Sequence, residues 1–268
     1  MAIIFPNIDP VILSISDTPL KITWYSLSYV VGILVAWVYI KYLNRLNKPN
    51  SLPIKVIDDL ITYLILGIVI GGRLGYVLFY DLANSLNNPL SIIQTWNGGM
   101  SFHGGLLGVI IASFIYCKIY KLQFFSIMDL LACATPIGLC LGRIANFING
   151  ELYGRITDVS WGVIFPGQSE PRHPSQIYES FLEGLILFLI LFTLYNKVKR
   201  FPGTASGLFL ILYALFRGLI ENYREPDGHI GFIISNITMG QLLSAPMIIT
   251  GLAILYYNYR FKTTTKKF

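Results

Sequence analysis

Seven apolar segments of this chain are each close to the roughly 20 residues that a helix needs to cross a bilayer. In lipid only helices or closed barrels satisfy every backbone hydrogen bond, and these segments are too long for barrel strands. The sequence therefore predicts an all-α, polytopic membrane protein, a bundle of about seven transmembrane helices. The predicted spans are residues 24–42, 56–79, 102–120, 127–147, 177–195, 203–223 and 238–257.

Composition agrees with this class. Hydrophobic residues make up 54% of the 268 residues and charged residues only 13%, whereas soluble domains carry roughly 25% charged residues. We expect a single transmembrane domain over residues 1–268, with an interfacial amino-terminal segment at 1–23 and a loop region on the outer face at 148–176. The cysteines Cys117, Cys133 and Cys140 lie in or at the end of apolar runs, which predicts packing residues rather than disulfides or metal ligands.

Lysine and arginine are distributed unevenly between the loops that alternate along the spans. Thirteen of the 20 basic residues fall on one side. By the positive-inside rule that side is cytoplasmic, so we expect the amino terminus outside and the carboxyl terminus in the cytoplasm. The net charge of +6 then reflects topology, and we expect no nucleic-acid partner. The thirteen residues are Lys41, Arg45, Lys48, Lys55, Lys118, Lys121, Lys197, Lys199, Arg200, Arg260, Lys262, Lys266 and Lys267.

A polar cluster at residues 142–155, GRIANFINGELYGR, directly follows an apolar run. Placing an arginine such as Arg143 inside hydrocarbon costs about 2.5–3.5 kcal/mol on insertion scales, so it indicates a functional site with a partner. The alternative is an interfacial loop whose arginines extend to lipid phosphates.

Two further polar positions lie in the second and third spans. His103 stands at the outer mouth of a helix in the string GGMSFHGG, where glycines let a backbone or a ligand come close. It is either a hydrogen-bonded structural residue or a catalytic one. Arg73 stands between Gly71 and Gly75, a pair with the GxxxG spacing of ordinary helix packing. The sequence leaves open whether Arg73 and Asp129 act in catalysis or in packing.

The fifth and sixth spans carry polar residues at their outer ends. In RHPSQIYE, residues 172–179, Pro174 predicts the first turn of a helix, and the polar residues after it fit a structural anchor or a substrate contact. Tyr213, Arg217, Glu221 and Arg224 recur at i, i+4, i+8 and i+11, which is one helical face. Arg217 and Glu221 could also simply neutralise each other.

The chemistry that these residues suit is phosphate handling. The sequence has no HExxH, Walker-type, GxSxG or aspartate-rich motif, and we expect no metal and no cofactor. Guanidinium groups bind phosphate oxygens bidentately and can stabilise the charge on a departing phosphate. A single imidazole can accept a proton from a thiol whose free pKa is about 8.5.

Five stretches resemble the prolipoprotein diacylglyceryl transferases, bacterial membrane enzymes, and the resemblance covers nearly the whole chain. It implies transfer of the sn-1,2-diacylglyceryl group of phosphatidylglycerol to the lipobox cysteine thiol of a prolipoprotein signal peptide. A thioether forms and glycerol phosphate is released, as the first step of lipoprotein maturation. It also implies a multi-pass protein of the plasma (inner) membrane, in contact with membrane lipids, whose active site faces the periplasm. The stretches are Trp24-Tyr25, GGMSFHGG, GRIANFINGELYGR, RHPSQIYE and FRGLIENYREPD.

The resemblance also implies residue roles. Arg143 and Arg217 would bind phosphate and stabilise the leaving group, and His103 would be the candidate general base. The remaining substrate-binding candidates are Tyr25 and Tyr213 as hydrogen-bond donors, Asn146, Glu151 and Gly154 around the head group, and Glu221 and Arg224 as a structural or gating pair.

Two alternatives come from other classes. A secondary transporter or channel for an anionic ligand would use Arg73, Arg217 and Glu221 as pathway residues, but the sequence lacks the internal repeat that is common in transporters of this size. A non-enzymatic lipid-binding protein would explain the arginines, but it would not need His103 among glycines.

Overall fold

The computed structural model describes residues 2–6, 8–14, 21–47, 51–95, 98–226, 232–234 and 237–265. Of the residues and motifs named above, Lys48, Lys266, Lys267 and the last residue of FRGLIENYREPD, Asp227, lie outside the described residues. The helices are α1 (Trp24–Leu46), α2 (Ile54–Tyr80), α3 (Leu82–Asn87), the 3-10 helix η1 (Pro89–Ile93), α4 (Phe102–Ile119), α5 (Phe124–Ile148), α6 (Ser175–Glu179), the π-helical segment η3 (Ser180–Ile186), α7 (Leu187–Val198), α8 (Thr204–Ile220) and α9 (Met239–Thr265).

Every predicted span overlaps a helix, and the span at 177–195 lies within the continuous run of α6, η3 and α7. Among the described residues, five helical runs are long and apolar enough to cross a membrane: Trp24–Leu46, Phe102–Ile119, Phe124–Ile148, Ser175–Val198 and Met239–Asn258. α8 is apolar but has 17 residues, and the 27-residue α2 is not one of the five. The prediction of an all-α, polytopic membrane protein is confirmed, and its orientation stays a prediction.

The strands of the described residues are short and pair two by two. β1 (Ile3–Ile4) runs parallel to β4 (Val163–Ile164), which attaches the start of the chain to the connection between α5 and α6. β2 (Val11–Ser14) pairs antiparallel with β3 (Lys21–Thr23). β5 (Phe232–Ile234) pairs antiparallel with β6 (Ile237–Thr238) just before α9.

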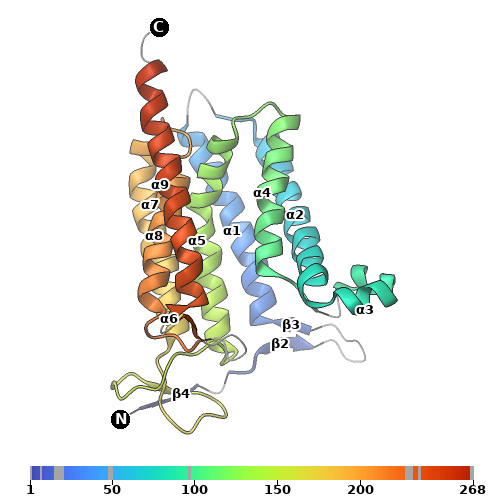
Figure 1. The fold of residues 1–268 in the computed structure, drawn as a ribbon, viewed down its shortest axis with the longest axis vertical. Helices are drawn as coiled ribbons and strands as arrows, with labels where there is room; N and C mark the ends of the chain where they lie inside the picture. Colours follow the sequence, from blue (N-terminus) through green and yellow to red (C-terminus); the bar gives the residue numbers. More distant parts are fainter. Residues whose placement is uncertain are drawn as a thin grey trace. The chain divides into compact units, whose positions relative to one another are not determined.

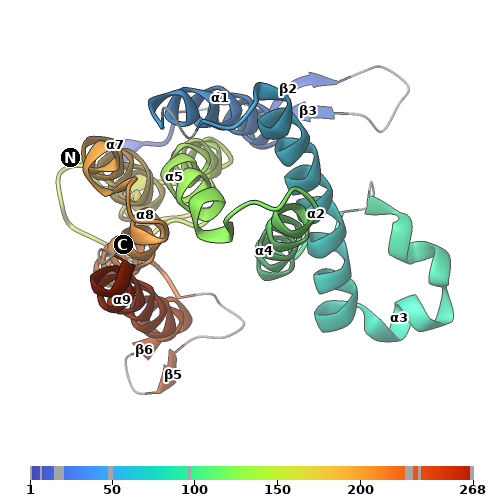
Figure 2. The same ribbon diagram turned by 90° about the horizontal axis from the view of Figure 1, so that it is seen from above.

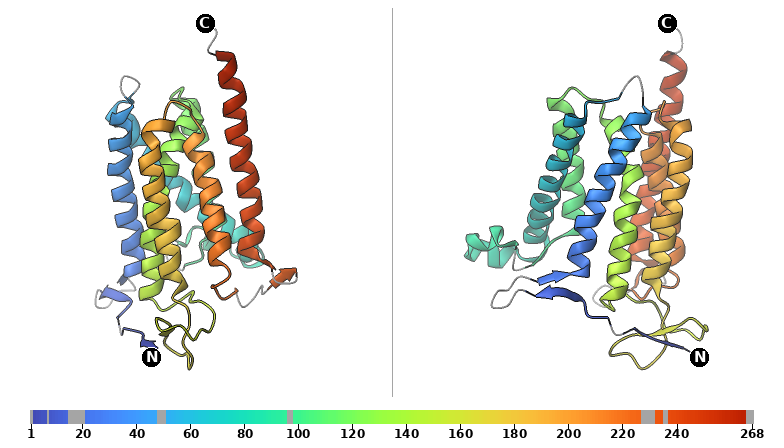
Figure 3. Two further views of the ribbon diagram at one scale, coloured as in Figure 1. Left: turned by 90° about the vertical axis from the view of Figure 1, so that its left-hand side faces the viewer. Right: turned by 180° about the vertical axis from the view of Figure 1, so that it is seen from behind.

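The chain divides into two compact units, and each is described by itself. The first unit comprises Met1–Ile40 and Asp129–Phe268, and the second comprises Lys41–Met128. Within the first unit α8 packs between α7 and α9 (Figures 1 and 2). Glycines allow the α8–α9 approach, because a Cβ on Gly251 would lie 2.8 Å from the carbonyl oxygen of Gly207. α7 and α8 run side by side in opposite directions, joined by a short turn (Figure 3).

Asp129 is a buried carboxylate whose role the structure defines. It lies on α5 and accepts hydrogen bonds from the backbone N–H of Gly203 and from the N–H and hydroxyl of Ser206, each at 2.7 Å. These donors belong to the start of α8, where the first N–H groups of a helix have no partner within it. Asp129 therefore caps α8 from a neighbouring helix, and the negative charge suits the helix N-terminus.

In the second unit, α2 and α4 pack closely along their lengths (Figure 1). Glycines form the contact: a Cβ on Gly71, Gly104 or Gly108 would collide with backbone of the facing helix. The predicted GxxxG packing of Gly71 and Gly75 is therefore present, and its partner is α4. α3 and η1 follow α2 and lead to the segment that starts α4.

Two details differ from or extend the sequence-based expectations. α8 ends at Ile220, so Glu221 is the C-cap and Arg224 lies beyond the helix, in an antiparallel bridge to Gly154. The predicted helical stripe is therefore continued by a turn. All three cysteines, each within the described residues, are free thiols. Cys117 and Cys133 are buried, which suits the packing role that the sequence predicts for them.

Candidate active site

Glu179 lies at the centre of an ion-pair network in the first unit. Pro174 is the N-cap of α6, so the helix begins at Ser175 and Glu179 is its last residue, with 1% of its surface exposed. Its Oε2 lies 2.6 Å from Nε of Arg143 and 3.1 Å from Nη1 of Arg217, and its Oε1 lies 3.8 Å from Nε of Arg224. One carboxylate thus connects α5, α8 and the turn that follows α8.

Arg217 is surrounded by three carboxylates. In addition to its contact with Glu179, its Nη1 lies 3.7 Å from Oε1 of Glu183, and its Nη2 lies 2.5 Å from Oε1 of Glu221. Glu183 is fully buried on η3, four residues after Glu179. The predicted Arg217–Glu221 pair is present, as one contact in a larger cluster.

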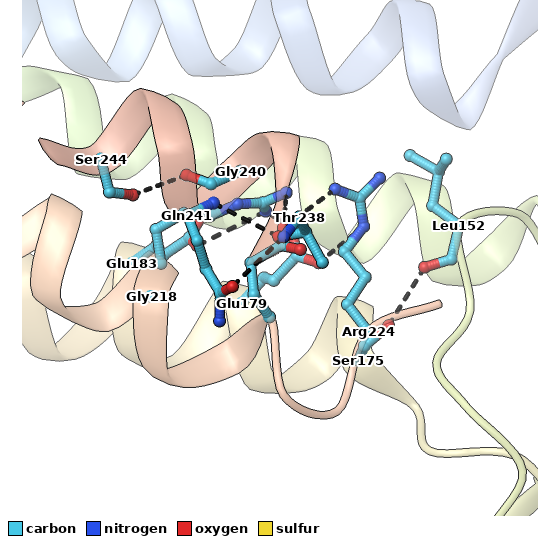
Figure 4. A network of polar contacts seen from close by, with 12 residues as sticks. Leu152, Ser175, Glu179, Glu183, Gly218, Arg224, Thr238, Gly240, Gln241 and Ser244 are labelled. Carbon is cyan, nitrogen blue, oxygen red and sulfur yellow. Dashed lines mark hydrogen bonds and ion pairs between the residues drawn. The ribbon is translucent and has the colours of Figure 1, made fainter. Parts of the chain in front are cut away.

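The start of α9 closes this cluster (Figure 4). Thr238 and Gln241 exchange hydrogen bonds between side chain and backbone, the reciprocal arrangement of a capping box. Between them, Gly240 leaves room for the ion pair, because a Cβ there would collide with Oε1 of Glu221 and lie 3.1 Å from Nε of Arg217. Glu221 also lies 3.5 Å from Nη1 of Arg224.

The formal charges of the cluster balance. Three guanidinium groups (Arg143, Arg217 and Arg224) face three carboxylates (Glu179, Glu183 and Glu221). Burying an ion costs several kcal/mol, which is offset only when the partners are well placed. Arg143 has 21% of its side chain exposed, against 11% for Arg217. The guanidinium of Arg143 is therefore the more accessible of the two that the sequence assigned to phosphate.

A chain of hydrogen bonds runs from Arg143 through Asn146 to Glu151, which lines a cavity. Nη1 of Arg143 lies 3.4 Å from Oδ1 of Asn146, and Nδ2 of Asn146 donates to Oε1 of Glu151 at 2.8 Å. Asn149 donates to the same Glu151 oxygen at 3.1 Å. The cavity, of about 480 Å³, is lined by Tyr25, Asn146, Asn149, Glu151, Pro10, Thr23 and Leu152.

Side chains of α6 hydrogen-bond to the backbone of Glu151 and Leu152, which line this cavity. Leu152 has a φ of +58°, which is uncommon for a residue other than glycine. The hydroxyl of Ser175 donates to the Leu152 carbonyl at 3.1 Å, and Nε2 of Gln176 donates to the Glu151 carbonyl at 2.7 Å. These contacts keep the carboxylate of Glu151 at the cavity and show why the motif at 172–179 combines polar residues with a helix start.

Gly154 joins this loop to the turn after α8. Its N–H donates to the carbonyl of His173 at 2.8 Å, and a Cβ there would lie 2.5 Å from the carbonyl oxygen of Tyr223. The side chain of Arg155 supports the same junction, since its Nε donates to the Arg224 carbonyl at 2.9 Å. At Gly154, which the sequence places near the head group, the backbone of the loop therefore comes close to the backbone of the turn after α8.

His173 is packed in an aromatic cluster next to this junction. Its Nδ1 lies 3.2 Å from the hydroxyl of Tyr178, and its ring packs edge-on against Tyr223 with centroids 5.2 Å apart. Burial lowers the pKa of the His173 imidazole below its usual range, and the charge of Asp158 opposes this shift in part. The neutral imidazole is therefore favoured.

The structure brings most of the predicted site residues together within the first unit. Arg143, Arg217, Glu221 and Arg224 share the ion cluster, and Tyr25, Asn146 and Glu151 share the cavity. Tyr213 lies on α8 one turn before Arg217 and stacks on Phe209. His103 belongs to the second unit and is exposed in the first turn of α4.

Three site residues were missed or only partly recognised from the sequence. Glu179 was noted only as an anchor or a contact, and Glu183 and Gly240 were not singled out. Two acidic residues four apart inside an apolar span are a usable signal, because a buried carboxylate in lipid requires a partner. Gly240 carries no such signal. Across the described residues, no group of three or more His, Cys, Asp or Glu side chains has the arrangement of a metal site.

Fold and site together define a polytopic membrane protein with a buried cluster of arginines and carboxylates beside a polar cavity. Residues 10–257 match the family described as prolipoprotein diacylglyceryl transferase. The chain therefore belongs to the prolipoprotein diacylglyceryl transferase family, as the resemblance predicted.

Similar proteins cover nearly the same length. The phosphatidylglycerol--prolipoprotein diacylglyceryl transferases of Rickettsia akari and Rickettsia felis are each 56% identical over 250 residues, which is 92% of this chain and 95% of theirs. That of Rickettsia canadensis is 54% identical over 255 residues, covering 94% of this chain and 97% of its own.

Proposed function

We propose that this chain is a phosphatidylglycerol–prolipoprotein diacylglyceryl transferase of the bacterial plasma membrane. Its family membership and its long similar relatives support the transferase activity. The acceptor is the lipobox cysteine of a prolipoprotein, presented by a signal peptide. The cysteine sulfur attacks the glycerol carbon that bears the phosphate, the C–O bond breaks, and glycerol phosphate leaves with the bonding electrons.

The observation that carries this proposal is the arrangement of Arg143. Its guanidinium is fixed by Glu179 on one side and contacts Asn146 on the other, next to the cavity that Tyr25 and Glu151 line. A planar, permanently charged group held in this way suits two phosphate oxygens. A phosphate bound there would have its developing charge stabilised by donors that are already oriented.

Arg217 acts with Arg143 through their shared carboxylate. Both guanidinium groups contact Oε2 of Glu179, so the position of one depends on the other. We assign to Arg143 the direct contact with the phosphate. Arg217 contributes positive charge near the phosphate without being assigned a direct contact. Tyr25 and Tyr213 supply hydroxyl donors, and Glu221 and Arg224 hold the turn after α8.

His103 is the proposed base that accepts the proton of the thiol. An imidazole nitrogen can act as a general base toward a thiol, and the thiolate is the nucleophilic form of cysteine. In this proposal the active site faces the periplasm. The thirteen basic residues mark the opposite side of the membrane as cytoplasmic. The lipid enters sideways, so its acyl chains stay in hydrocarbon.

A transfer assay tests the proposal. Purified protein receives radiolabelled phosphatidylglycerol and a lipobox peptide, or the same peptide with its cysteine changed to serine. Label on the cysteine peptide alone, together with released glycerol phosphate, is expected. A folded protein that binds the lipid but transfers nothing would favour lipid binding or transport instead.

Substitution of Arg143 tests the assigned site. Arg143→Lys keeps the charge but loses the bidentate fork, so we expect transfer to fall about 100-fold or more. Arg200→Lys is the matched control, because Arg200 is exposed in the turn between α7 and α8. Equal activity of the two variants would exclude Arg143 as the phosphate ligand.

A further inference from the structure

Arg73 is a buried arginine to which the proposed reaction assigns no role. It lies on α2 among small residues, with 7% of its surface exposed. Among the residues that the structure describes, no carboxylate lies within ion-pair distance of its guanidinium. Since a charged group in a membrane protein is costly without partners, its hydrogen bonds identify what it does.

Four backbone carbonyls receive the donors of Arg73. Nε donates to Ile92 at 2.9 Å and Nη2 to Ser91 at 2.5 Å, both in η1. Nη1 donates to Gly98 at 2.5 Å and to Gly99 at 3.0 Å, just before α4. A cation is favourable beside the carbonyls at the end of a helix, and the Ser91 carbonyl accepts from the N–H of Gln94 as well. One guanidinium therefore connects α2 to η1 and to the two glycines Gly98 and Gly99.

The segment that Arg73 holds contains two glycines in the left-handed region of backbone space. Gly98 and Gly99 have φ values of +83° and +78°, which side chains other than hydrogen rarely allow. The ring of Tyr76 lies against Gly99, and its centroid is 5.6 Å from the Arg73 guanidinium carbon. Gly98 and Gly99 are thus held against α2.

The same segment sets where α4 begins. The N–H of Ser101 donates to the carbonyl of Gly72 at 2.9 Å, and the Ser101 hydroxyl accepts from the N–H of Gly104 at 3.2 Å as the N-cap. His103 is the second residue of this helix. Its backbone therefore takes its position from Ser101 and from the loop that Arg73 holds.

We propose that Arg73 is a positioning residue that acts on the reaction through His103. It holds residues 98–101 against α2, and this anchor fixes the first turn of α4 and the direction of the imidazole. The route through His103 rests on the proposed function, whereas the anchor itself rests on the four hydrogen bonds.

A double-mutant cycle tests the route. We expect Arg73→Met to lower kcat about 100-fold with little change in KM for phosphatidylglycerol, because misplacing a catalytic group by about 1 Å has an effect of this size. Arg73→Lys, which keeps the charge but cannot reach all four carbonyls, should lie between. In a His103→Gln background, Arg73→Met should cause no further loss. An equal loss in both backgrounds would overturn the route.

Hydrogen exchange tests the anchor independently of activity. In detergent-solubilised protein, Arg73→Met should speed amide exchange in residues 98–104 at least about 10-fold, since local opening governs exchange. Lys55→Met is the matched control: Lys55 is exposed on the same helix, and the variant removes the same charge. Unchanged exchange in Arg73→Met would overturn the anchor. Full activity of His103→Gln would instead count against His103 as the base. The anchoring role of Arg73 would then be decided by the hydrogen-exchange result alone.

Discussion

Arg143 and Arg217 carry the same charge in different surroundings, and this difference separates their contributions to folding. Arg217 compensates Glu179, Glu183 and Glu221, whereas Arg143 pairs, among the described residues, with Glu179. Removing one partner of a buried ion pair destabilises a protein by about 3–5 kcal/mol. We expect Arg217→Ala to lower the unfolding temperature clearly and Arg143→Ala to lower it much less, although both should lose transfer.

Thermal unfolding in detergent, beside the transfer assay, checks this prediction. A loss of transfer in Arg217→Ala has then to be read together with its stability. Arg143→Ala separates chemistry from folding, since its guanidinium is partly exposed. Equal unfolding temperatures of the two variants would contradict the central structural role of Arg217.

His173 predicts a pH dependence of stability. Its pKa in the folded protein is lowered by burial, so the unfolded chain, with an ordinary value of about 6.5, takes up the proton first as the pH falls. The contribution of His173 to the free energy of unfolding is therefore constant above that value and decreases below it. His173→Gln should make the unfolding temperature less sensitive to pH between about 7.5 and 5.5. A steeper dependence in the variant would contradict the lowered pKa.

At the scale of elements, the α2–α4 contact depends on particular glycines. A Cβ on Gly108 would collide with the carbonyl of Gly67, whereas a Cβ on Gly105 would lie 3.7 Å from the nearest facing atom, the carbonyl oxygen of Ile68. Overpacking of this kind typically costs about 1–3 kcal/mol. We expect Gly108→Ala to lower the unfolding temperature, and Gly105→Ala on the same helix to leave it nearly unchanged. Equal effects of the two substitutions would show that the helices adjust freely.

The helices themselves could be predicted because hydrocarbon imposes their length. The predicted span at 102–120 and α4 (Phe102–Ile119) differ by one residue. The end of α8 was placed three residues too late, since Tyr223 is apolar enough to continue the pattern while Arg224 turns away to bridge Gly154. That bridge joins positions 70 residues apart, and the sequence around either position does not predict the pairing.

For the whole molecule, the sequence identified the arginines of the site better than their partners. Arg143 and Arg217 stand out because a charge in an apolar run needs an explanation. Their common partner Glu179 was seen only as a residue near the interface, because the motif around it begins in a loop. The partners of Arg73 are carbonyl groups, which every residue has, so only the folded chain could reveal them.

The orientation of the whole molecule in the membrane is predicted by the distribution of its lysines and arginines. Glu170 is exposed in the connection between α5 and α6, and Arg200 is exposed between α7 and α8, at opposite ends of one helical run. With the native cysteines replaced, Glu170→Cys should react with an impermeant maleimide in intact spheroplasts, and Arg200→Cys only after permeabilisation. This follows because Arg200 belongs to the lysine- and arginine-rich side, which stays in the cytoplasm. The reverse pattern would place Arg143 and its cavity on the cytoplasmic side and exclude a periplasmic active site.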